Sequence, residues 1–156
     1  QTLRMGDSQI PFRKLKKRFS CEKIELLQTD IYVLNEHKYI EEITLKHGEL
    51  VICKTTDLNK AVALITSNQN IFMPTLTVNY PVVARENNIS GVTRIGFVIT
   101  KNGTIDDIHV FQRLGGGCTE SLISTVNSMS NQLIQKGYNN SKTYYIELTF
   151  SFILIG

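Results

Sequence analysis

The chain has 156 residues, a formal net charge of +3, a hydrophobic share of 42% and a charged share of 20%. This length suits one ordinary domain or two very small ones, and the composition excludes a largely disordered chain. No apolar run approaches the roughly 20 residues of a membrane-spanning helix, so we expect no membrane span in this chain.

Residues 1–20 are predicted to be a poorly ordered leader, because they have no steady hydrophobic period and contain Gly6 and Pro11. The dense basic run at 13–18 is typical of a solvated face or a flexible leader. Nucleic-acid binding would need basic residues gathered on one surface with aromatic partners, so we expect no nucleic-acid partner.

Residues 21–74 are predicted to form a small α+β region. Within residues 38–55, two strand-like runs flank a probable tight turn at His47-Gly48. A helix is expected next, with Asp57 as its N-cap and apolar residues at helical spacing. The order strand, turn, strand, helix returns in the second half, so residues 21–74 are a candidate divergent repeat.

Residues 75–156 predict an antiparallel three-stranded sheet with helices packed on one face. Pro81 is expected in the first turn of a short helix that ends near Gly91. Residues 92–100 and 105–112 form the first two strands, joined by a hairpin turn at Asn102-Gly103, where both turn positions need positive φ. An interruption of the apolar alternation at residues 106–107 indicates a β-bulge.

Two further elements complete this region. A main helix is expected over 120–129, with Thr119 as N-cap and Leu122, Ile123 and Val126 facing inward. A long final strand follows over 143–154, where apolar side chains alternate with mostly polar ones. The alternation predicts one core face and one mostly solvated face.

The final strand is the candidate binding surface. A long strand at a sheet edge offers unpaired N–H and C=O groups to another chain. Charged side chains discourage such pairing, and this strand has only Lys142 and Glu147. We therefore expect an extended peptide or a second copy of the chain to pair with it, forming a homodimer in the second case. The predicted partner-binding residues are Thr143, Tyr145, Glu147, Thr149 and Ser151.

The stretch RLGGGCTE at 113–120 has three interpretations. A phosphate loop is disfavoured, because no lysine follows the glycines and Glu120 at the helix start would repel a phosphate. A reactive thiol, with Cys118 as nucleophile and His109 as base, would make the chain a cysteine-dependent enzyme, and this stays open as the alternative. The favoured interpretation is a strand-to-helix turn that packs Cys118 as a small apolar residue. Three histidines and three cysteines show no ligand spacing, so we expect neither metal nor cofactor.

The sequence over about residues 75–155 resembles a known family, the TonB C-terminal domain. The resemblance rests on a Tyr-Pro and alanine helix, a glycine before a strand, a hairpin with a Gly-containing turn, a Gly-Gly-Cys-Glu-like helix entry and an aromatic final strand. These features fall at Tyr80, Pro81, Ala84, Gly91, Phe97, Gly103, Gly115 to Cys118 and the residues from 143 on. The chain departs from the family after the main helix, where it lacks the usual tryptophan and prolines.

The resemblance implies a non-catalytic interaction module in the periplasm of a Gram-negative bacterium. Members of the family join an inner-membrane motor to outer-membrane receptors, and they grip a short receptor peptide by adding it as a strand to a sheet edge. A role in outer-membrane transport, with an outer-membrane receptor segment as partner, is therefore expected.

Overall fold

The structure is a computed structural model, and it describes residues 2–5, 8–11, 25–28, 42–46 and 50–155. Two short strands, β1 (Thr2–Met5) and β2 (Ser8–Pro11), pair antiparallel. A mixed sheet of six strands contains β3 (Glu25–Gln28), β4 (Glu42–Lys46), β5 (Leu50–Thr55), β6 (Gly91–Ile99), β7 (Ile105–Gln112) and β8 (Thr143–Phe152). Their order across the sheet is β3-β4-β5-β8-β6-β7.

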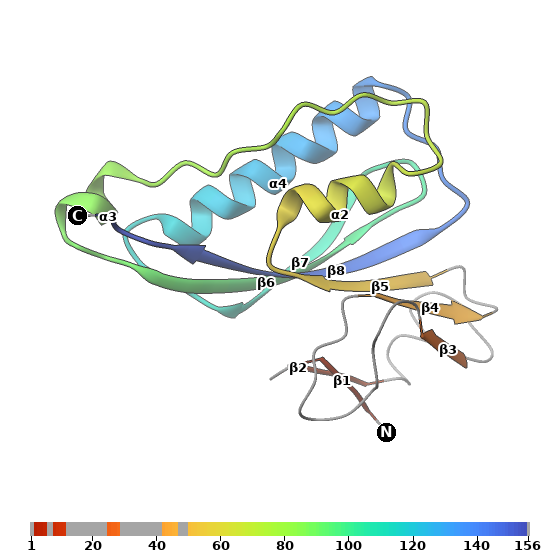
Figure 1. The fold of residues 1–156 in the computed structure, drawn as a ribbon, viewed down its shortest axis with the longest axis horizontal. Coiled ribbons are helices and arrows are strands. Elements are labelled where there is room, and N and C mark those ends of the chain that lie inside the picture. Colours follow the sequence, from red (N-terminus) through yellow and green to blue (C-terminus); the bar gives the residue numbers. More distant parts are fainter. Residues whose placement is uncertain (1, 6–7, 12–24, 29–41, 47–49, 156) are drawn as a thin grey trace.

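The α+β fold with an antiparallel three-stranded sheet is confirmed for the second half of the chain. β6 lies between β7 and β8 and pairs antiparallel with both. Helix α4 (Cys118–Gln135) is longer than the expected 120–129 and lies on the same face of the sheet as α2 (Leu58–Ile65) (Figure 1). The strand count differs from expectation, because β5 extends this sheet on the β8 side.

The region before residue 74 contributes to the same sheet and core. β4 and β5 pair antiparallel as predicted, while the turn expected at His47-Gly48 lies outside the described residues. α2 begins as predicted, since the Asp57 carboxylate accepts a hydrogen bond from Asn59 N–H at 2.9 Å. That residues 21–74 form a unit of their own stays a prediction. Of the expected leader, residues 2–5 and 8–11 form β1 and β2, whereas residues 1, 6–7 and 12–20 lie outside the described residues.

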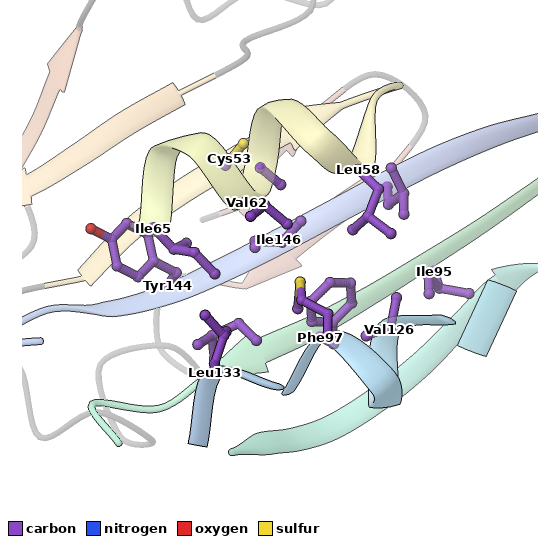
Figure 2. Packing of buried hydrophobic residues seen from close by; sticks show 14 of the residues in the cluster. Cys53, Leu58, Val62, Ile65, Ile95, Phe97, Val126, Leu133, Tyr144 and Ile146 are labelled. Atoms are coloured by element: carbon purple, nitrogen blue, oxygen red, sulfur yellow. The ribbon is translucent and has the colours of Figure 1, made fainter. Parts of the chain in front are cut away.

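One hydrophobic core joins the elements before and after residue 74. Figure 2 shows side chains of β5 and α2 lying against those of β6, β8 and α4. The contributing residues include Cys53, Leu58, Val62, Ile65, Ile95, Phe97, Val126, Leu133, Tyr144 and Ile146. Between α2 and α3 (Val82–Glu86), an extended segment crosses the molecule above α4 (Figure 1). Pro81 is the N-cap of α3 rather than a residue of its first turn.

The β6–β7 hairpin confirms the predicted turn and the predicted bulge, with one correction. Of the two expected turn positions only Gly103 has a positive φ, at +95°. The Asn102 carboxamide oxygen instead accepts a hydrogen bond from the Thr100 hydroxyl, which stabilises a turn with one left-handed residue. Register shifts along β7 fall opposite Gly96–Val98, where the Asp106-Asp107 interruption predicts a bulge, and at Arg94–Ile95.

The three glycines form the strand-to-helix turn that the sequence favours. Gly116 and Gly117 have φ values of +68° and +85°, and Gly117 is the N-cap of α4. Thr119 is therefore not the cap, which corrects the sequence prediction. Its buried hydroxyl instead accepts from Leu114 N–H at 2.8 Å and lies 2.9 Å from the Thr93 hydroxyl, so it ties the helix start to β6.

Candidate functional site

The predicted binding strand lies inside the sheet over most of its length. β8 pairs with β6 on one side from Tyr144 to Phe152, and with β5 on the other side from Thr143 to Leu148. The β5 pairing is parallel. The interpretation of residues 143–148 as a free edge is therefore wrong, because β5, from a distant part of the sequence, occupies it.

A short part of β8 keeps one open side. β5 ends at Thr55, opposite Leu148, and the chain then turns into α2. The β6 pairing continues to Phe152. Among the residues that the structure describes, no backbone hydrogen bond joins Thr149–Phe152 to any segment other than β6. We call Thr149–Phe152 the open edge.

A hydrogen bond of the hairpin shows which way the peptide groups of β6 point. Thr100 N–H donates to the Thr104 carbonyl at 3.0 Å, so the backbone groups of Thr100 face the β7 side. Backbone groups of an antiparallel strand alternate in direction from residue to residue. The N–H and C=O of Ile99, and of every second residue before it, therefore face β8.

The register between β6 and β8 determines which backbone groups of the open edge face away from β6. Ile99 pairs with Tyr144, so the backbone groups of Tyr144 and of every second residue after it bond to β6. The intervening residues present their N–H and C=O groups to the opposite side. At Thr149 and Ser151 that side is the strand position beside β8 that β5 no longer occupies after Thr55. We call this unoccupied strand position the open lane, or simply the lane. The open edge thus presents two N–H donors and two C=O acceptors.

The face of β8 that the sequence predicts to be solvated is partly or fully buried in its first half. Glu147 is fully buried, and its carboxylate lies 3.6 Å from the Lys54 ammonium of the cross-strand partner on β5. Burial, with the Glu147 carboxylate beside it, raises the pKa of Tyr145 above its ordinary value. The prediction of solvated side chains is therefore wrong at Glu147, whereas Ser151 is exposed as expected.

A hollow opens next to the open edge, on the helix-covered face of the sheet. It has a volume of about 490 Å³. Its walls come from the start of α2, the extended segment after it, and β8. The lining residues are Thr56, Asp57, Leu58, Asn59, Leu76, Thr77, Val78 and Phe150. No local pattern of residues indicates this hollow, since its walls meet only where β5 ends against β8.

Comparison with known proteins gives the family. The model of the family described as Gram-negative bacterial TonB protein C-terminal matches residues 77–154, which is half of the chain. The chain belongs to the TonB C-terminal family.

A solution structure of the TonB C-terminal domain of Helicobacter pylori also matches. It is 18% identical, covers 64% of this chain and 81% of its own, and has a TM-score of 0.38. No curated protein matches the chain.

The family match covers α3, β6, β7, α4 and β8. We call the last four of these elements the TonB C-terminal unit. Within this unit β8 is an outer strand, and β5, which covers six of its residues, lies outside the match. TonB C-terminal domains are non-catalytic protein-interaction domains, and this chain is a TonB-like interaction module.

The TonB C-terminal unit keeps Cys118 and His109 apart. Cys118 is fully buried at the start of α4, against Ala84 and Phe152. Burial, and secondly the Glu120 carboxylate, raises the pKa of its thiol, which disfavours the thiolate. His109 is exposed on β7, and its neighbours in the chain face the core, so its side chain lies on the face of the sheet away from α4. The centroids of the His109 and Phe111 rings are 4.6 Å apart. Nothing in this arrangement favours the cysteine-dependent enzyme.

Over the described residues, no group of three or more His, Cys, Asp or Glu side chains is placed to hold a metal ion. Helices in that part of the chain are too short or too polar to cross a membrane.

Proposed function

We propose that this chain is a periplasmic interaction module of a Gram-negative envelope, and that it binds an extended peptide by strand addition at the open edge. The partner is a segment of another envelope protein, such as an outer-membrane receptor, and the role is in outer-membrane transport. Membership of a family described as Gram-negative bacterial TonB protein C-terminal supports the location and the partner class.

The observation that carries the binding mode is the early end of β5. β8 continues for four residues past Leu148, bonded to β6 on one side only. The backbone groups of Thr149 and Ser151 face the open lane, where an incoming strand would bond to them. Thr143, Tyr145 and Glu147 present the same groups to β5 instead, so the proposed surface shrinks to the second half of the predicted one.

The other edge of the TonB C-terminal unit is a poorer surface for a strand. β7 departs from regular register at two places along its length. Such irregularities interrupt the row of donors and acceptors that an added strand needs, and they are a common means of blunting an edge. The β6–β8 pairing shows no register shift from Gly91 to Ile99, so the open edge remains regular.

Thr149→Pro is expected to weaken peptide binding about tenfold or more relative to Thr149→Ala, because proline removes the outward N–H and its ring intrudes into the lane. The loss should spare the sheet, since the removed donor does not bond to β6. The probe is the seven-residue peptide acetyl-Thr-Ser-Thr-Leu-Thr-Ser-Thr-amide. Its affinity for each variant of the 156-residue chain is measured from the shifts of protein amide resonances.

Two controls accompany this test. Thermal unfolding midpoints of the two Thr149 variants show that both are folded, and Ser151→Pro against Ser151→Ala repeats the comparison at the second outward donor. Equal affinities of folded proline and alanine variants would contradict strand addition at this edge. Sedimentation of the free chain decides the competing case, in which the edge pairs with a second copy and only dimerisation responds to proline.

A further inference from the structure

Backbone bonds at the open edge cannot by themselves give a selective complex. Two donors and two acceptors supply at most four hydrogen bonds, and each contributes little net affinity because it replaces a hydrogen bond to water. Together they correspond to an affinity of roughly 1 mM before the cost of ordering the peptide. In strand addition, the selectivity comes from pockets that receive alternate side chains.

The sheet register places one such side chain. Along the lane beside β8, Val51, Cys53 and Thr55 lie opposite Tyr144, Ile146 and Leu148, on the face covered by α2 and α4. The next position of this column lies opposite Phe150. It is vacant because the chain leaves the sheet after Thr55 and enters α2. A strand added in the lane fills it with its own side chain, since side chains of neighbouring strands share faces.

The hollow lies where this side chain would point. Phe150 lines the hollow and packs partly against the hydrophobic core, so it is on the helix-covered face. Leu58, Leu76 and Val78 add further apolar side chains to the lining. The wall is held in place, because Asn59 bonds to both backbone groups of Leu76, at 2.8 Å to its N–H and 3.0 Å to its carbonyl.

We propose that the hollow is a side-chain recognition subsite, which takes one large apolar residue of the peptide bound at the open edge. The occupant is leucine, isoleucine or phenylalanine, at the peptide position that lies opposite Phe150. This inference rests on the proposed strand addition and adds its selectivity. The backbone bonds fix the peptide in the lane, and the subsite decides which residue stands beside the end of β5.

The test varies only the central residue of the probe. In acetyl-Thr-Ser-Thr-X-Thr-Ser-Thr-amide, X is leucine or alanine, and all other side chains are polar. The leucine peptide is expected to bind the full chain about tenfold or more tightly than the alanine peptide, from the apolar surface that the subsite covers. Amide resonances of the protein follow the titration.

Two matched variants place the selectivity in the hollow. Thr77→Phe puts an aromatic ring at the rim of the hollow and is expected to reduce the preference for the leucine peptide over the alanine peptide below about twofold. Thr75→Phe is the control. Thr75 is exposed on the same extended segment, outside the lining, and this variant keeps the tenfold preference.

The outcomes separate the subsite from the strand addition on which it rests. Equal affinities of both peptides, with Thr149→Pro still weakening each, would overturn the subsite and leave strand addition standing. A leucine preference that survives Thr77→Phe would also overturn the subsite. If neither peptide shifts the amide resonances of Thr149 and Ser151, strand addition fails, and the subsite fails with it.

Discussion

Gly116→Val is expected to lower the free energy of unfolding by about 2 to 6 kcal/mol, through backbone strain and overpacking together. The φ of Gly116 is +68°, which a β-branched residue adopts only under strain. A Cβ at this position would lie 2.8 Å from the Ala84 Cβ and 2.9 Å from the Ile89 Cδ1. The substitution therefore forces α3 away from the start of α4. Urea denaturation of the purified variant measures the loss.

The neighbouring glycine provides the control. Gly115 has no left-handed φ, and a Cβ there would meet no atom within 4 Å. Gly115→Val is expected to change the free energy of unfolding by less than about 1 kcal/mol. If the two valine variants unfolded at the same urea concentration, the glycine run would not be the close-packed turn described above.

Glu147→Gln is expected to cost about 3 kcal/mol or more of unfolding free energy, because it removes the carboxylate charge that faces the buried Lys54 ammonium. The pair joins neighbouring residues of β5 and β8, at 3.6 Å. Its loss should therefore loosen the strand that covers the first half of β8. Urea denaturation again gives the cost.

A double-mutant cycle separates the ion pair from the other contacts of its members. Lys54→Met in the Glu147→Gln background should cost less than Lys54→Met alone, with a coupling free energy above about 1 kcal/mol. Strict additivity of the two substitutions would mean that the pair does not hold β5 on β8.

Local signals in the sequence were sufficient for much of the fold. The cap at Asp57 and the turn at Gly103 depend on chemistry within a few residues, and both are confirmed. The bulge expected at Asp106-Asp107 is visible as a break in the apolar alternation, and the register shift confirms it. The antiparallel pairing of β6 with β7 likewise follows from the predicted hairpin turn.

Contacts between distant segments account for the errors. A parallel partner for β8 leaves no local mark, so the sequence could not show that β5 covers residues 143–148. The same strand brings Lys54 to Glu147 and buries a face that alternation alone assigns to solvent. Thr119 is of a residue type common at N-caps, but its hydroxyl bonds to Leu114 and contacts Thr93. Gly117 is the N-cap of the helix instead.

The most direct test of the open edge is amide hydrogen exchange along β8, in the free protein and with the leucine peptide bound. In the free protein we expect rapid exchange at Thr149 and Ser151, whose N–H groups face the open lane, and slow exchange at Tyr145, whose N–H faces β5. The peptide should slow Thr149 and Ser151 and leave Tyr145 unchanged. Slow exchange at Thr149 and Ser151 in the free protein, or no slowing when the peptide is bound, would contradict the account.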